Sequence, residues 1–480
     1  MCGGGMAFGV RRGRRQVLRV LAALAGSGLQ SARAAEQGAA PVAARPKTGA
    51  RMITQMIGAN GWASAPGDVA MWKDMGITWG RDVVGPGQGE SASSIMDVDK
   101  TSPTYISDLP PAILANNRNG IHSLLLLGFT PWWNATVPKD SKSAPKDVRA
   151  WERYVEAAVR KYSAPPYNVK YFQVWNEAAG KLSGGLPQAT FWHGPDDDGK
   201  LDRPYERAMQ DYVERIHIPA ARIIRKYKAY VVYGGWPDQG GLDTFTQWIE
   251  YRSPTLNERM LDCVDYLDFH YLNVDDLSPI YDKYVKNGPA RGIWQTEIGD
   301  RFIIDPFYLP RYFFDFAVWA LERNWDDPDK YVSMVYHWDG YEPFRLTHRG
   351  PPRTYNVSGK SLVVLRKTLP GALAPLAASL KFSEDASGSA LYSGSDIVVQ
   401  VSASTGWRTV EINTGSTPAS GQASVAFIDA LTGVAAAAQD AQATWNGSTL
   451  SVRFKVPLVM NGAERKTPAH LAYLVVRSKA

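Results

Sequence analysis

The chain has 480 residues, a length that predicts one large domain with a smaller one. Hydrophobic residues make up 45% of it and charged residues 21%, the balance of a soluble globular protein. The formal net charge of +6 stems from six arginines within residues 1–34, a segment that contains no Asp, Glu or Lys. Without that segment the chain is near neutral, so its charge gives no reason to expect nucleic acid or an anionic membrane as a partner.

The N-terminus has the features of an export signal. Arg14–Arg19 resembles the twin-arginine motif, an apolar run extends from Val20 to Leu29, and Ala32–Ala34 has the small-x-small pattern of a cleavage site. The apolar run is shorter than the roughly 20 residues that a membrane-spanning helix needs. We therefore expect residues 1–34 to be a twin-arginine-type signal peptide, residues 35–50 a linker, and the mature protein to be periplasmic or extracellular. A disordered basic tail is the alternative.

The cysteines and acidic runs give little sign of a metal. Cleavage would remove Cys2, which leaves Cys263 as a single thiol, expected to be buried and structural. No Cys and His cluster has zinc spacing and no glycine-rich phosphate loop is present, so we expect no metal or cofactor. The run Asp196–Gly199 hints at calcium, but no complete ligand pattern follows it, so a solvated acidic loop is the better explanation.

Short apolar runs alternate with helical stretches through residues 51–365. Such alternation predicts βα units and a parallel sheet, and eight runs are the number that a (β/α)8 barrel needs. Helical stretches such as residues 148–162 and 205–228 lie between the runs. The predicted strands are residues 56–60, 77–81, 123–129, 169–175, 229–233, 266–271, 292–296 and 332–338.

The composition changes from about residue 366 onwards. Short alternating runs such as Ile397–Val401 and Leu450–Phe454 are separated by turn residues such as Asn446 and Gly447. This pattern predicts an antiparallel β-sandwich over residues 366–480. The expected fold class is therefore α/β: a (β/α)8 TIM barrel with a small C-terminal antiparallel β-sandwich domain.

Two glutamates follow predicted strand ends. Trp175, Asn176 and Glu177 end the fourth strand, and Thr296 with Glu297 ends the seventh. Active sites of TIM barrels lie at the carboxyl ends of the strands, so both carboxylates should face one mouth. Glycoside hydrolysis needs two such carboxylates, one protonated to assist the leaving oxygen and one ionised to attack the anomeric carbon. A lone Glu could be a helix cap or a surface charge, whereas the pair predicts hydrolytic chemistry.

The residues around both glutamates resemble the clan A glycoside hydrolases. Val174–Glu177 is similar to the acid/base strand of that clan, and Trp294–Gly299 is similar to its nucleophile strand. The nearest likeness is to the β-xylosidase and exopolysaccharide-hydrolase group (family 39-like), and it spans roughly residues 51–345. The other strand-end motifs that carry it are Gly76–Arg81, Gly128–Trp133, Gly234–Trp236, Asp268–Tyr271 and Tyr336–Trp338.

Some positions depart from the pattern of that group. Ala178 stands where a proline is common after the Asn-Glu pair, and His270 is adjacent to Tyr271 where the group has His-x-Tyr. The first change affects the loop, and the second leaves open which of the two residues contacts the nucleophile. Residues 178–203 resemble an enlarged loop over the site. The departures indicate a divergent member whose sugar the resemblance does not name.

The resemblance implies a retaining glycoside hydrolase that cleaves β-linked oligo- or polysaccharide by double displacement. Glu297 would be the nucleophile and Glu177 the acid/base. Arg81 would keep Glu297 ionised through a charge-assisted hydrogen bond. Asn176 would bind the sugar 2-hydroxyl and Trp338 would stack on the ring. The other expected substrate contacts are His270, Tyr271, Trp132, Trp133 and Trp236.

The sequence also allows other interpretations of these residues. Arg81 could be only a structural ion-pair partner, His270 a core histidine, and one of Trp132 and Trp133 a core residue. For the whole protein, the alternatives are a catalytically inactive carbohydrate-binding barrel in polysaccharide assembly or export, and a transglycosylase. The intact pair of glutamates argues against the inactive barrel. The transglycosylase shares every catalytic residue and differs only in its acceptor.

Overall fold

The structure is a computed structural model that describes most of the chain after residue 50. The predicted signal peptide, the predicted linker, Asp196–Gly199 and nearly all of the predicted enlarged loop lie outside the described residues. Within the described part, no helix has the length and apolar character needed to cross a membrane. The described residues are 51–61, 66–84, 109–138, 142–178, 208–237, 241–299, 307–323, 333–338, 345–348, 350–415, 423–456 and 470–478.

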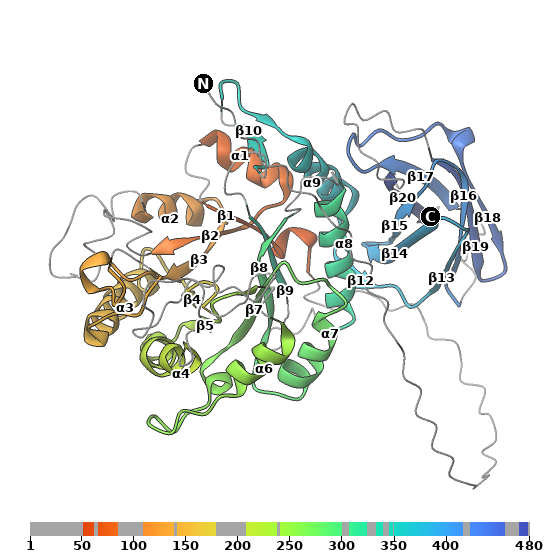
Figure 1. Ribbon diagram of the computed structural model, residues 1–480. Coiled ribbons are helices and arrows are strands. Elements are labelled where there is room, and N and C mark those ends of the chain that lie inside the picture. The colour runs from red at the N-terminus through yellow and green to blue at the C-terminus, as the bar shows by residue number, and fades with distance from the viewer. Residues whose placement is uncertain are drawn as a thin grey trace, which may run out of the picture. The chain divides into compact units, whose positions relative to one another are not determined.

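Eight parallel strands of the described chain close into a barrel with helices outside them (Figure 1). The strand β1 (Ile57–Asn60) pairs with β2 (Trp79–Val84) on one side and β9 (Ser333–His337) on the other. The ring closes where β5 (Tyr230–Val232) pairs with β7 (Tyr266–His270). Each strand overlaps one of the eight predicted runs, so the predicted barrel is confirmed. The remaining strands are β3 (His122–Leu127), β4 (Tyr171–Val174), β8 (Gly292–Ile298) and the two-residue β6 (Trp236–Pro237), which pairs with β7.

Among the outer helices, α3 (Val148–Ser163) buries one clear apolar stripe. It begins after Asp147, whose side chain accepts a hydrogen bond from the Arg149 N–H as an N-cap. Its buried residues include Trp151, Tyr154, Val155, Ala158, Val159 and Tyr162, which follow helical spacing. The other helices are α1 (Pro66–Met75), α2 (Leu109–Arg118), α4 (Ala208–Tyr212), α5 (Ile218–Lys226), α6 (Leu242–Glu250), α7 (Leu277–Ile280), α8 (Tyr308–Leu321) and α9 (Val357–Thr368).

An aromatic cluster fills part of the barrel interior. Its place along the strands determines which residues form the next inward-facing layer. The Trp294 ring lies 5.6 Å from Trp79, 5.2 Å from Tyr171 and 5.0 Å from Tyr266, measured between ring centroids. Successive residues of a strand point to opposite faces, so the next inward positions lie two residues further on. Those positions carry Arg81, Gln173, Asp268 and Thr296. The aromatic layer therefore supports a buried polar layer just below the mouth.

The C-terminal residues form two antiparallel sheets, ordered β12-β14-β15-β20-β17 and β13-β16-β19-β18. Val399, Val410, Val452 and Leu474 belong to one buried core that draws on both sheets, which confirms the predicted β-sandwich. The predicted boundary between residues 365 and 366 falls inside α9, and the domain limits stay predictions. The strands are β12 (Leu373–Pro375), β13 (Ser379–Phe382), β14 (Ala386–Ser393), β15 (Asp396–Ala403), β16 (Gly406–Asn413), β17 (Ala423–Asp429), β18 (Ala441–Asn446), β19 (Thr449–Val456) and β20 (His470–Ser478).

Cys263 is a free, buried thiol, as predicted. It closes the short 3-10 turn Met260–Cys263, and its Sγ lies 3.1 Å from Oε2 of Glu258. Burial, together with the hydrogen bond to that carboxylate, raises the pKa of the thiol to about 12. A thiol with so high a pKa is a poor nucleophile, so Cys263 is a structural residue.

Candidate active site

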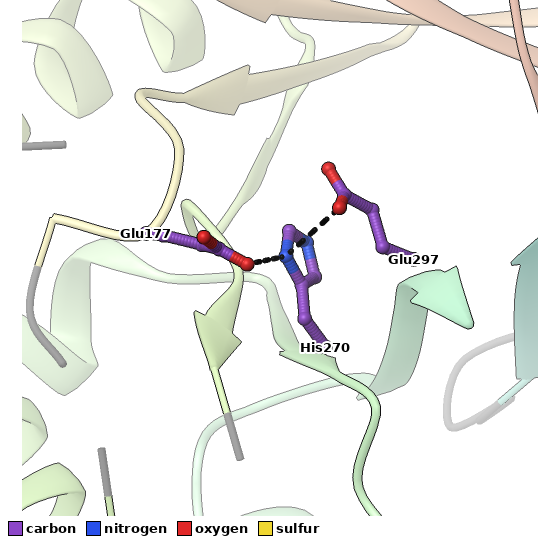
Figure 2. Close-up of side chains that lie close together, drawn as sticks. All are labelled: Glu177, His270 and Glu297. Carbon is purple, nitrogen blue, oxygen red and sulfur yellow. Dashed lines mark hydrogen bonds and ion pairs between the residues drawn. The ribbon is translucent and has the colours of Figure 1, made fainter. Parts of the chain in front are cut away.

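Glu177, His270 and Glu297 meet at the carboxyl ends of the barrel strands. Nδ1 of His270 lies 2.7 Å from Oε1 of Glu177 and 3.7 Å from Oε2 of Glu297. Figure 2 shows the imidazole between the two carboxylates, each on a different strand end. One oxygen of each glutamate and a ring nitrogen of His270 all lie within 4.8 Å of one another. The two glutamates singled out by the sequence therefore share one site.

The backbone at these strand ends adopts a conformation that is uncommon for residues with a side chain. Trp175, Glu177 and Tyr271 have φ angles of 69°, 46° and 59°. Such left-handed residues outside glycine are uncommon and cluster at functional sites. The Glu177 N–H donates to the Gly234 carbonyl oxygen at 2.6 Å. A Cβ on Gly234 would collide with the carbonyl oxygen of the β4 strand end, so glycine is needed for this close approach.

Arg81 holds the site together from β2. Its side chain is 4% exposed, and Nη1 donates to Oε1 of Glu297 at 2.6 Å and to Oδ1 of Asn60 at 2.7 Å. Nη2 donates to Oδ1 of Asn176 at 2.6 Å, and Nε donates to Oε1 of Gln173 at 2.7 Å. The planar guanidinium fixes all four partners in one geometry, which a lysine could not do.

The surroundings of Glu297 favour its charged form. The side chain is 12% exposed. Burial alone would raise the pKa of this carboxyl, but the charges of His270 and Arg81 hold the pKa below its ordinary value of 4.5. The Tyr271 hydroxyl adds a hydrogen bond at 3.5 Å. Both members of the adjacent His-Tyr pair thus approach Glu297, which answers the question that the sequence left open.

His270 is fully buried, and a chain of polar groups fixes its ring from below. Nε2 lies 2.9 Å from Oγ1 of Thr296, and that hydroxyl donates to Oδ2 of Asp268 at 2.6 Å. Asp268 also accepts the Thr296 backbone N–H at 2.9 Å and the Gln173 side-chain amide. His270, which the sequence predicts to contact the substrate, has no exposed surface in this structure, and its ring contacts the two glutamates and Thr296.

The carboxylates around His270 favour its protonated form. Burial would lower its pKa, but the charge of Glu297, the nearby Asp268 carboxylate and the hydrogen bond with Glu177 raise the pKa to about 10. The core-histidine interpretation is therefore incomplete, because the buried ring has acidic partners on both sides.

Three tryptophans expected at the site are partly open to solvent. The backbone N–H of Trp338 donates to the Ile298 carbonyl at 2.9 Å, which places this half-buried residue beside the end of β8. Trp132 and Trp133 lie in the short 3-10 turn Trp132–Asn134 that follows β3. Trp132 is half-buried and Trp133 is 48% exposed, so neither ring is a core residue.

Trp236, which the sequence predicts to line the sugar site, is a core residue. It is 1% exposed, and its indole N–H donates to the Gly241 carbonyl at 3.2 Å. Its ring packs edge-on against Phe245 and Trp248 of α6, with centroid distances of 5.5 and 5.9 Å. Trp236 lies on the short β6, and its side chain packs against α6. It therefore belongs to the core between the barrel and that helix.

The substitution Trp236→Ala is expected to lower the free energy of unfolding by about 3–5 kcal/mol, because it leaves a large cavity in a packed core. The exposed Trp133 provides the matched control, since Trp133→Ala should change stability by less than about 0.5 kcal/mol. Urea unfolding of both variants measures the difference. Equal stabilities would contradict the placement of Trp236 in the core.

The polar partners Asn60, Gln173, Asp268 and Thr296 were not assigned roles from the sequence. Asn60 accepts from Arg81 and donates through Nδ2 to the carbonyls of Thr296 (3.0 Å) and His337 (3.2 Å), which links its own strand β1 to β2, β8 and β9. The sequence holds a usable pattern for Gln173, Asp268 and Thr296. Each of them stands two residues after an aromatic residue that faces the barrel interior on the same strand.

The three grouped atoms of Glu177, His270 and Glu297 also have the chemistry of a metal donor set. In this structure they bind one another, Arg81 and Thr296 through hydrogen bonds and ion pairs. A metal ion would have to replace these contacts, so we assign the cluster to proton and charge chemistry.

No family model matches the chain, and no curated protein matches it either. Solved structures do match. A GH30 endoxylanase from Clostridium papyrosolvens aligns over 90% of this chain and 99% of its own, with 14% identity and a TM-score of 0.55. A family 30 subfamily 8 xylanase from Clostridium acetobutylicum aligns over 89% and 97%, with 12% identity and a TM-score of 0.53. A GH39 β-xylosidase from Caulobacter crescentus aligns over 91% and 98%, with 16% identity and a TM-score of 0.50. The likeness shows that this chain has the fold of these glycoside hydrolases.

Proposed function

We propose that the protein is a retaining glycoside hydrolase acting on β-linked oligo- or polysaccharide. The observation that carries this proposal is the closeness of the carboxylates: one oxygen of Glu177 lies within 4.8 Å of one of Glu297. Retaining enzymes hold their carboxyl groups about 5–5.5 Å apart, whereas inverting enzymes need about 6.5–9.5 Å to admit a water. The value for this site is the closest approach of single oxygens rather than the separation of the carboxyl groups, and it fits the retaining arrangement, in which one glutamate attacks directly.

The charges around the two glutamates support their division of labour. Glu297, ionised beside Arg81 and His270, would attack the anomeric carbon as the bond to the leaving oxygen breaks. Glu177 would pass its proton to that oxygen. In the second step Glu177 would take a proton from water, which attacks the same carbon and releases Glu297.

The side chains at the mouth support sugar binding. Asn176 accepts from Arg81 through Oδ1, so its amide N–H groups would donate to a sugar hydroxyl. The half-buried Trp338 would stack on the sugar ring, and Trp132 and Trp133 would extend the binding surface. The similar solved structures are described as xylanases and a β-xylosidase, which puts xylan and xylo-oligosaccharides first among the substrates to try.

The proposed function is tested by measuring reducing-sugar release from xylans, β-glucans, mannans, galactans and bacterial exopolysaccharides, with wild type and Glu297→Gln compared. Release by wild type that the variant lacks is expected. Trapping with an activated 2-fluoro sugar should label Glu297, and a label on another residue would reject its assignment. Binding of a polymer without release would favour a carbohydrate-binding barrel, and transfer products would favour a transglycosylase.

We propose that the chain is exported by the twin-arginine route to the periplasm or the outside of the cell. The support is the sequence of residues 1–34, with its arginine pair, apolar run and cleavage pattern. Replacing Arg14 and Arg15 together by lysine should leave the unprocessed protein in the cytoplasmic fraction. Unchanged export of that double variant would reject the route.

A further inference from the structure

His270 lies between two groups whose charges must change during the proposed reaction. Its Nδ1 faces Glu177 at 2.7 Å and Glu297 at 3.7 Å, and its side chain has no exposed surface. On the other side of the ring, the Thr296 hydroxyl gives its own hydrogen to Asp268 and therefore accepts one from Nε2. Nε2 is thus protonated, and the charge of the ring depends on whether Nδ1 also carries a proton.

The surrounding charges require that second proton. Three carboxylates face the ring: Glu177, Glu297 and Asp268, the last with Oδ2 at 3.7 Å from Nε2. Arg81 contacts Glu297 but no other member of this set. At each stage of the proposed reaction one of the two glutamates is ionised beside Asp268. With a neutral imidazole, Arg81 would be the one cation among the described residues of this cluster to balance two carboxylates, a costly arrangement. From the β5–β6 connection, Gly235 packs against the ring and brings no charge, and a Cβ there would collide with the imidazole.

The proposed reaction moves one negative charge from one side of His270 to the other. Before the first step Glu297 is the carboxylate and Glu177 carries a proton. Bond formation between a Glu297 oxygen and the anomeric carbon turns Glu297 into a neutral ester. The bond to the leaving oxygen breaks, that oxygen takes the Glu177 proton, and Glu177 becomes the carboxylate. Arg81 faces only the first of these positions, whereas Nδ1 of His270 faces both.

We propose that His270 is a positioning residue that keeps both ring protons throughout, a fixed cation that stabilises the Glu297 carboxylate before glycosylation and the Glu177 carboxylate after it. The inference rests on the proposed function. The negative charge moves from Glu297 to Glu177 while the cation that compensates it stays in place. The buried polar groups around it therefore need little reorganisation during the reaction. Thr296 and Asp268 hold the ring at the required angle.

The pH profile of kcat/KM tests this role. In the free enzyme the His270 cation beside Glu297 lowers the pKa of that carboxyl. The variant His270→Gln removes the charge, so the acidic limb, set by ionisation of Glu297, should move to higher pH by about one unit or more. Loss of activity with the acidic limb unmoved, or moved to lower pH, would overturn the proposal.

His217 provides the matched control. It is also fully buried, but its ring lies 3.1 Å from the Cys263 carbonyl, and burial lowers its pKa to about 3, so it is neutral. The variant His217→Gln should leave the acidic limb in place. A shift like that of His270→Gln would show that loss of any buried histidine moves the profile, which would also overturn the proposal.

A direct measurement covers the case in which His270→Gln does not fold. The chain has seven histidines, and selective ¹⁵N labelling of the wild type reports which rings carry two protons. The His270 signal, identified by its displacement in Thr296→Val, should remain that of an imidazolium at pH 8. A neutral ring at pH 7 would overturn the proposal. By contrast, equal activities of wild type and Glu297→Gln would reject the proposed function itself.

Discussion

Replacement of the nucleophile, Glu297→Ala, is expected to lower kcat on an aryl β-glycoside by roughly 10⁴- to 10⁶-fold, the loss that follows removal of a residue that forms a covalent intermediate. The carboxylate that attacks is gone, while Arg81 and His270 remain as two cations around an empty space. A small anion such as azide should occupy that space and attack the anomeric carbon once. The product would be the α-glycosyl azide, detected by NMR.

The complementary variant Glu177→Ala provides the control for this result. With a good leaving group no proton is needed, so Glu297 should still form the glycosyl-enzyme and the second step should become slow. Azide should then replace the missing base-assisted water and yield the β-glycosyl azide, because two displacements retain configuration. An α-azide from Glu177→Ala, or a β-azide from Glu297→Ala, would mean that the two roles are exchanged.

The strand ends were the part of the site that the sequence could predict. Each predicted run ends within three residues of the end of a parallel strand, and in a barrel all such ends meet at one mouth. This local rule was enough to expect Glu177 and Glu297 together, although 119 residues separate them in the sequence. Arg81 followed from the same rule, because it too lies near the end of a predicted strand and the structure places it against Glu297.

The rest of the site depends on contacts across the barrel, which no local pattern contains. Gln173 joins Arg81 to Asp268, and Asn60 joins Arg81 to the carbonyl of Thr296, so each role exists only once three strands have closed. Burial is equally non-local. Trp236 follows a strand end as Trp338 does, yet α6 covers the first ring and leaves the second half-buried.

The position of Arg81 implies the second large effect, a loss of both activity and stability in Arg81→Met. Methionine fills much of the same space but leaves Glu297 with one cation fewer and deprives Asn60, Asn176 and Gln173 of their donor. Breaking a buried ion pair by removing one partner costs about 3–5 kcal/mol. Urea unfolding at pH 7 should show a loss of that size, and kcat/KM should fall by about 100-fold or more because the nucleophile loses its orientation.

The pH dependence of the Arg81→Met effect distinguishes charge from packing. The pKa of Glu297 is held low in the folded protein, so its ion pair contributes stability above the ordinary value of 4.5 and loses it as the pH falls through the folded-state pKa. The stability gap between wild type and Arg81→Met should therefore be largest near pH 7 and shrink below about pH 4.5. The exposed pair Arg153–Asp147, at 3.5 Å, is the control: Arg153→Met should cost less than about 1 kcal/mol. A gap for Arg81→Met that does not change with pH would assign the loss to packing and contradict the charged contact with Glu297.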